Sequence, residues 1–211
     1  MTLRQFLFFT ALSLPACGLL ILFGDQPITL FVHRHTGWAV PFFSAYTAAA
    51  DVAFDAAMST HVLGLPVLWV GLLGLFVLGR WVLKRRWGTL ALVVLLTNIA
   101  SQGSSNVLKG TVHRLRPEVL FSGGYPGTGL WAAGPHNDSF PSTHTAIYFS
   151  LFWPLALAFP RWRVPLLVMP GLIMLGRLVL GAHYPSDVWF SAWLVVAFTF
   201  LFGRLDKPGQ M

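Results

Sequence analysis

Two histidines in this sequence stand among residue types that support proton transfer and nucleophilic chemistry. His144 follows a proline and two hydroxyl residues in SFPSTHT (139–145), and His183 lies four residues before Asp187 in GRLVLGAHYPSD (176–187). A proline between the two suits the first position of a helix, so Asp187 would fall in a first helical turn, within reach of the imidazole. A carboxylate in that place fixes the tautomer of the ring and stabilises positive charge on it.

Three cationic side chains accompany the histidines. Lys109 and Arg116 belong to KGTVHRLRP (109–117), and Arg177 interrupts an apolar run. A charge inside a membrane span costs at least about 2.5–3.5 kcal/mol on insertion scales, so Arg177 needs a function or a route to the interface. A phosphoryl group spreads negative charge over three oxygens, which fixed cations stabilise. The three cations therefore predict an anion site, which we expect to hold phosphate.

The stretch before His144 is typical of a helix start. Ser142 after Pro141 is a candidate N-cap for the apolar run that follows. The first backbone N–H groups of such a helix, those of Thr143 and His144, have no partner within it and attract anions. Ser142 and Thr143 are therefore predicted to bind phosphate oxygens.

Composition indicates that these residues belong to a membrane protein. Of the 211 residues, 55% are hydrophobic and 10% are charged, against about 25% charged in an ordinary soluble domain. Mean hydropathy is +0.68. The net charge of +7 is attributed to membrane topology, and no nucleic-acid partner is expected. A single cysteine, Cys17, cannot form an internal disulfide.

Apolar stretches predict an all-α, polytopic membrane protein with a bundle of six transmembrane helices in one domain, 1–211. A span needs about 20 mostly apolar residues. A cleaved signal sequence ending at Cys17 is an alternative for the first stretch, but the apolar run continues past it. The predicted spans are 5–23, 61–83, 88–108, 144–160, 164–181 and 187–203.

Basic residues predict the orientation of this bundle. With six spans and an inner amino terminus, most of them fall on one side, which the positive-inside rule makes cytoplasmic. The group comprises Arg4, Arg80, Lys84, Arg85, Arg86, Arg161, Arg163, Arg204 and Lys207. The phosphate-binding cations then lie at the opposite, outer face.

Two long connections are expected at the outer face. Residues 24–60 carry Trp38, Phe42, Phe43 and Tyr46, which could form an interfacial helix or an aromatic cap over the bundle. Residues 109–143 include a Gly/Pro-rich loop, 119–138, which could be a lid or a connector.

The three motifs together resemble the phosphatidic acid phosphatase type 2 superfamily, which includes membrane lipid phosphatases, bacterial acid phosphatases and vanadium haloperoxidases. That family carries K-x6-R-P, then P-S-G-H, then S-R-x5-H-x3-D, in this order. Thr143 stands here in place of the glycine, and Gly176 in place of the serine. The motifs cover residues 109–187, and the six-span layout extends the resemblance over most of the chain.

The resemblance implies an acid phosphatase/haloperoxidase-like core and a phosphohistidine mechanism. His183 would be the nucleophile, supported by Asp187, and His144 the general acid that later activates water. Nearby polar residues are interpreted as loop or rim residues. These are His113, Arg114, Glu118, His136 and Asp138.

The expected function is hydrolysis of a lipid phosphate or diphosphate in the bacterial inner membrane, at a site facing the periplasm. Undecaprenyl diphosphate is the first choice of substrate; phosphatidylglycerol phosphate, phosphatidate and lipid A phosphate are alternatives. A lipid phosphotransferase using the same intermediate stays open, and an anion transporter is a remote alternative. No metal-ligand spacing is present, so we expect no metal, no cofactor and no obligatory protein partner.

Overall fold

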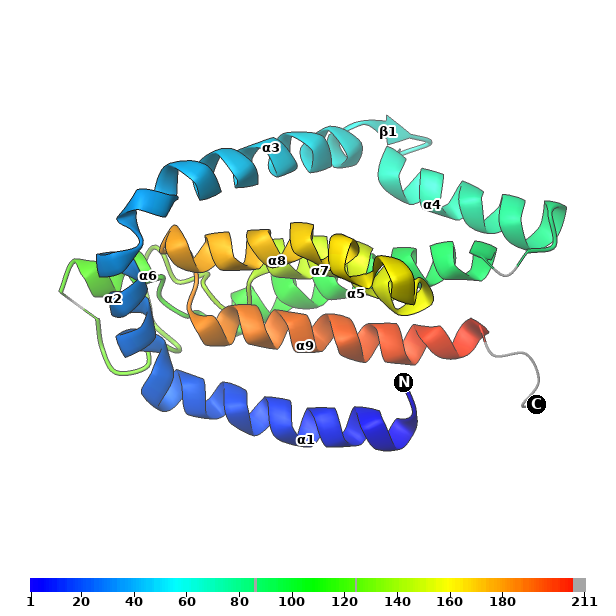
Figure 1. Ribbon diagram of the computed structural model, residues 1–211. Coiled ribbons are helices and arrows are strands. Elements are labelled where there is room, and N and C mark those ends of the chain that lie inside the picture. The colour runs from blue at the N-terminus through cyan, green and yellow to red at the C-terminus, as the bar shows by residue number, and fades with distance from the viewer. Residues whose placement is uncertain (86, 124, 207–211) are drawn as a thin grey trace.

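The computed structural model describes residues 1–85, 87–123 and 125–206, and this part of the chain is almost entirely helical. The elements run lengthwise in an elongated bundle (Figure 1). The α-helices are α1 Leu3–Leu19, α2 Asp25–His35, α3 Val40–Ser59, α4 Val67–Val77, α5 Trp87–Val112, α6 Pro117–Phe121, α7 Thr143–Ala158, α8 Arg163–Val179 and α9 Pro185–Phe202. Shorter pieces are the π-helical turns Leu20–Gly24 and Leu78–Val82, the 3-10 turns Gly37–Ala39, Pro160–Trp162 and Gly203–Asp206, and strands β1 His61–Val62 and β2 Leu65–Pro66.

The centre of the bundle is helix α7, which packs against α5, α8 and α9. The polar second half of α5 faces this interior: Thr97, Asn98, Ser101 and Ser105 are buried. Asn98 donates a hydrogen bond of 3.0 Å to the Ser150 hydroxyl on α7. Small and polar residues let transmembrane helices approach closely and bond to one another, which explains why α5 is only moderately apolar.

Four helical stretches of the described chain are long and apolar enough to cross a membrane. They are Leu3–His35, Trp87–Val112, Pro160–Val179 and Pro185–Leu205. The helix expected over 61–83 begins only at Val67, because residues 61–66 form a tight antiparallel hairpin. Helix α7 has 16 residues, just below the usual length of a span. The structure thus confirms a mostly helical membrane fold, and the number of six spans stays a prediction.

The segment 24–60 differs from both expectations. Helix α2 continues α1 through the π-helical turn, so the first helical stretch reaches His35 rather than residue 23. Helix α3 then runs lengthwise beside α8 instead of covering the end of the bundle (Figure 1). The contact is close at Gly176, where an added Cβ would lie 3.1 Å from Phe43 and 3.3 Å from Thr47. This packing explains why glycine, the smallest residue, replaces the serine of the family motif.

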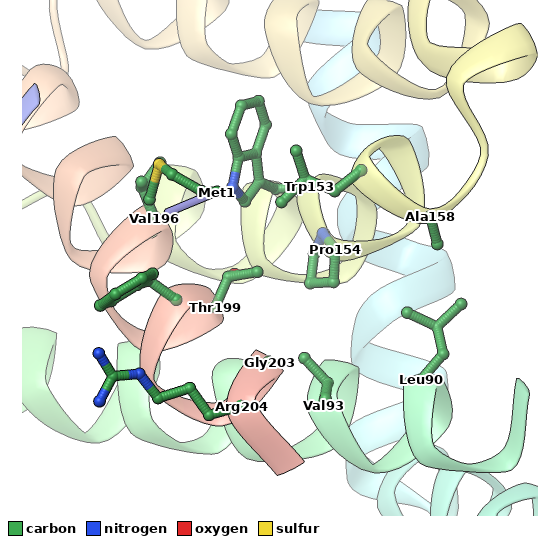
Figure 2. A pocket seen from close by; sticks show the side chains of 12 residues that line it. Met1, Leu90, Val93, Trp153, Pro154, Ala158, Val196, Thr199, Gly203 and Arg204 are labelled. Carbon is green, nitrogen blue, oxygen red and sulfur yellow. The ribbon is translucent and has the colours of Figure 1, made fainter. Parts of the chain in front are cut away.

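The two ends of the bundle differ in character. The amino terminus, the end of α7 and the end of α9 meet at one end (Figure 1). An apolar cavity of about 230 Å³ lies there, lined by Leu90, Val93, Trp153 and Arg204 among others (Figure 2). The opposite end holds α2, α6 and the loop that follows α6. Of the basic residues assigned to the inner side, Arg86 and Lys207 lie outside the described residues.

Candidate active site

The motif residues meet at the end of the bundle near α2 and α6. Helices α5 and α8 finish there, with Lys109 and Arg177 in their last turns. Helices α7 and α9 begin there, with His144 and Asp187 in their first turns. Because the chain reverses direction between neighbouring helices, residues far apart in sequence reach one end of the bundle.

A tight turn between α8 and α9 places His183. The N–H groups of Ala182 and His183 donate to the Arg177 carbonyl, at 3.0 and 3.2 Å. Gly181 adopts a φ of 63°, a left-handed conformation that glycine accepts without strain. The turn thereby ties the predicted nucleophile to the helix end that carries Arg177.

His183 is buried beside Asp187, as its spacing predicted. Its Nδ1 lies 3.5 Å from the Asp187 Oδ2, slightly longer than a normal hydrogen bond. Burial lowers the pKa of His183 to about 4; the Asp187 carboxylate opposes this shift, while Lys109 and Arg177 add to it. The imidazole is therefore neutral at pH 7, the protonation state that a nucleophile requires.

Asp187 is held by donors from three parts of the chain. Its Oδ1 accepts from Arg114 Nη1 at 2.7 Å, and its Oδ2 accepts from the Ser139 hydroxyl at 2.6 Å and the Tyr184 N–H at 2.9 Å. The carboxylate is fully buried. Such charge-assisted bonds keep a buried carboxylate ionised and oriented, so Asp187 can stabilise positive charge on His183.

Arg114 was expected to be a loop or rim residue; it lies in the loop after α5, but it is buried and not at the rim. Its side chain is 1% exposed and bridges Asp187 and Asp25, at 2.7 Å to each. It also donates to the Ser186 hydroxyl at 2.6 Å and lies over the Tyr184 ring. Burial alone would lower the pKa of Arg114, but the two carboxylates raise it more, so the guanidinium stays charged.

No local signal in the sequence marks Arg114 as buried. Residues two apart in extended chain point to the same side, whereas Arg114 and Arg116 here reach different partners, with Arg114 in the interior and Arg116 half-buried at the surface. Two arginines two positions apart gave no hint which one is buried. Arg114 is the buried one because it pairs with the carboxylate of Asp25, 89 residues away.

His144 lies in the first turn of α7 and contacts α3. Its Nε2 is 3.1 Å from the Asp51 Oδ2, and Asp51 also accepts a 2.8 Å hydrogen bond from the Tyr148 hydroxyl. The sequence analysis missed Asp51, because it lies 93 residues from His144 in a segment read as a connection. The imidazole remains partly exposed.

The start of α7 has the N-cap that the sequence predicted. Ser142 is the N-cap and accepts from the Thr145 N–H at 3.4 Å. The first intrahelical bond is made by Ala146, to the Ser142 carbonyl, so the N–H groups of Thr143 and His144 precede the hydrogen-bonded ladder. The Thr143 hydroxyl is buried without a hydrogen-bond partner in the described part of the protein. Both features offer donors to an anion at this helix end.

Two of the predicted phosphate-binding cations, Lys109 and Arg116, contact Asp138. Arg116 grips its carboxylate with two bonds, Nε to Oδ1 at 2.6 Å and Nη2 to Oδ2 at 2.7 Å. The Lys109 ammonium donates to the Asp138 carbonyl oxygen. The hydrogen bonds from Arg116 lower the pKa of Asp138 to about 2, so this carboxylate is charged at neutral pH and stands where an anion would bind Arg116. Arg177 lies in electrostatic range of Lys109 and His183.

The remaining polar residues of this region lie at the surface. His113, Glu118 and His136 are exposed, and Glu118 pairs with His136. These three are rim residues, as predicted. Among the residues that the structure describes, no three His, Cys, Asp or Glu side chains are placed to share a metal ion.

Comparison with known proteins agrees with the motif order. The sequence model of the PAP2 superfamily matches residues 87–207. A protein named lipid A 1-phosphatase from Rhizobium johnstonii is 33% identical over 104 residues, 47% of this chain and 43% of that protein. One of the same name from Rhizobium etli is 31% identical over 143 residues, 56% of this chain and 62% of that protein. The matches thus span about half the length of these relatives.

A solved structure shares the fold over nearly the whole chain. It is the transmembrane PAP2-type phosphatidylglycerolphosphate phosphatase from Bacillus subtilis, with a TM-score of 0.59, 20% sequence identity and 98% coverage of both chains. At this identity the likeness concerns the fold alone.

Proposed function

Since the chain belongs to the PAP2 superfamily, we propose that it is a membrane lipid phosphatase that works through a phosphohistidine on His183. The observation that carries the proposal is the buried pair of His183 and Asp187 at the same bundle end as Lys109, Arg116 and Arg177. A neutral imidazole beside clustered cations suits attack on a phosphorus atom whose oxygens carry negative charge.

The first chemical step transfers the phosphoryl group to the protein. Asp187 lies at Nδ1 of His183, which leaves Nε2 to attack phosphorus. A P–N bond forms as the P–O bond to the lipid breaks, and His144 donates a proton to the departing oxygen. Asp187 stabilises the positive charge that develops on the ring, and the fixed cations stabilise the phosphoryl oxygens.

The second step returns the protein to its starting state. His144, now neutral, takes a proton from a water molecule whose oxygen attacks phosphorus. The P–N bond breaks, inorganic phosphate leaves, and His183 is neutral again. A metal ion has no part in either step.

Substrate entry must displace an internal anion. The Asp138 carboxylate accepts from both Nε and Nη2 of Arg116. Two oxygens of a substrate phosphate can accept from the same two donors. We therefore propose that the loop carrying Asp138 moves when the phosphate binds, which fits the interpretation of residues 119–138 as a lid.

Lipid A phosphate is the substrate to test first, because the two curated relatives bear that activity in their names. Undecaprenyl diphosphate, favoured before the comparisons, and phosphatidylglycerol phosphate follow. We place the site at the periplasmic face of a bacterial inner membrane, where lipids of these classes present their phosphates and where the positive-inside rule puts this bundle end.

The test is phosphate release by purified protein from each of these lipids, with EDTA present. Release from at least one lipid by the wild type, and none by His183→Ala, supports the proposal. Release that occurs only with an added acceptor lipid would identify a phosphotransferase instead. Activity that EDTA abolishes would contradict the metal-independent mechanism.

A further inference from the structure

We infer that Asp51 on α3 is the positioning residue for His144, and that it makes Nδ1 of His144 the nitrogen that exchanges protons with substrate and water. This inference rests on the proposed function of His144. It adds a second imidazole–carboxylate pair to that of His183 and Asp187.

Both oxygens of the Asp51 carboxylate are engaged by α7. Oδ1 accepts from the Tyr148 hydroxyl at 2.8 Å, and Oδ2 faces His144 Nε2 at 3.1 Å. His144 and Tyr148 lie one helical turn apart on the same face of α7. The carboxylate thus spans one turn of the helix, and the Tyr148 bond directs its second oxygen at the imidazole.

The packing of α3 holds Asp51 in this place. One turn earlier, Thr47 is buried against the backbone of α8 at Gly176. The Tyr46 hydroxyl donates to the Met169 carbonyl of α8. Helix α3 is therefore fixed to the helix that carries Arg177, and Asp51 follows directly on the face that meets α7.

An ionised carboxylate at Nε2 decides which nitrogen reacts. A carboxylate accepts hydrogen bonds and donates none, so Nε2 must carry a proton towards Asp51 in both the neutral and the charged ring. Proton transfer then takes place at Nδ1. In the first step the Nδ1 proton goes to the departing lipid oxygen; in the second, Nδ1 accepts a proton from the attacking water.

The negative charge of Asp51 also stabilises the protonated ring that the first step needs. Burial acts on His144 in the opposite sense, and Arg177 and Lys109 add to its effect. A histidine among phosphate-binding cations would otherwise lose the proton that it must donate. Asp51 offsets these cations without touching the substrate.

The experiment compares wild type, Asp51→Asn and Asp55→Asn on two phosphate monoesters of different leaving group. Asp55 is the matched control, an exposed carboxylate one turn along α3. An alkyl ester of a lipid alcohol needs a proton from the general acid as it leaves; a 4-nitrophenyl ester does not. The rate of the first turnover is measured for both esters, so that the hydrolysis of phosphohistidine does not enter.

General acid catalysis contributes roughly 10²–10⁴-fold, so Asp51→Asn is expected to lose about 10- to 100-fold on the alkyl ester, a part of that range. It should keep the wild-type rate on the 4-nitrophenyl ester. Asp55→Asn should match wild type on both. Equal losses on both esters would show that Asp51 only supports the fold, and would overturn the inference.

A second readout does not require turnover. Nitrogen-15 spectra of labelled histidine, with His144 assigned by its substitution, should show the Nε2–H tautomer in wild type and a loss of this preference in Asp51→Asn. An Nδ1–H tautomer in wild type, or identical His144 signals in both proteins, would contradict the inference. If no lipid is hydrolysed, the proposed function fails, and the spectra still decide the role of Asp51.

Discussion

At the residue scale, the burial of His183 predicts the pH dependence of the first step. Burial lowers the pKa of His183 to about 4, so the nucleophile is neutral above that value. We expect kcat/KM to keep its full value well below pH 6.5 and to fall only as pH approaches 4. The measurement is kcat/KM between pH 3.5 and 8, on protein that remains folded. An acid limb centred near 6.5 would show that the site is open to water.

The same shift affects stability with a definite sign. Between pH 4 and 6.5 the unfolded chain binds a proton at His183 that the folded protein does not, so the free energy of unfolding decreases as pH falls through this range. His183→Gln removes this contribution. Thermal unfolding in detergent should therefore depend less on pH in the variant; equal dependence in both proteins would contradict the burial of His183.

Asp187 gives a second prediction at this scale. Asp187→Asn keeps the shape but removes the charge that stabilises the ring, and its amide can favour the wrong tautomer. Phosphate release should fall roughly 10²–10⁴-fold, the range expected for loss of acid–base assistance, with little change in KM. A fall of less than about tenfold would limit Asp187 to a structural role.

Sequence patterns located the reacting residues because those patterns are local. The spacing of His183 and Asp187 and the cap at Ser142 depend on one helical turn, and the structure has both. Arg114, Asp25 and Asp51 were missed for the opposite reason. Their partners lie 73 to 93 residues away, and one sequence contains no spacing that reveals which helices meet.

At the element scale, a buried charge network joins three elements. Arg114, in the turn after α5, bridges Asp25 of α2 and Asp187 of α9, and Asp25 also accepts from the Ser186 N–H at 2.9 Å. The N-terminal helix is therefore tied to the residue that orients the nucleophile. This tie explains why the first helical stretch continues beyond the predicted span as far as the site.

Breaking this network should destabilise the protein strongly. Removal of one member of a buried ion pair typically costs about 3–5 kcal/mol, because the other charge is left without a partner. Arg114→Met and Asp25→Asn should each lower the melting temperature, and the double variant should lose less than the sum of the two. Melting temperatures in detergent of the wild type, the two single variants and the double variant give a double-mutant cycle. Additive losses would mean that the two side chains do not interact.

Element boundaries were predicted less well than the site. At the hairpin, 61–66, the apolar composition extends past a change in backbone direction. At Leu3–His35 the helix instead continues past the end of the apolar run. Hydropathy reports where a chain can enter a membrane, but turns are decided by a few backbone conformations. Leu63 and Gly64, both with positive φ, make the hairpin that the apolar pattern hid.

At the scale of the whole molecule, the account requires the site to face outward. Cys17 is the only cysteine of the sequence, and it is buried, so a Cys17→Ser background can carry one new thiol. Ser122→Cys, in the loop after α6, should react in intact cells with a reagent that does not cross the membrane. Arg161→Cys, between α7 and α8 at the other end, should react only after lysis. The reverse pattern would place the site inside.

The central claim is that phosphate passes through His183. Brief reaction with a lipid carrying ³²P-phosphate, an alkaline quench that preserves phosphohistidine, and peptide mass spectrometry test it most directly. The account predicts label on His183 in wild type and none in His183→Ala. Phosphate release without label on His183, or label that persists in His183→Ala, would contradict it.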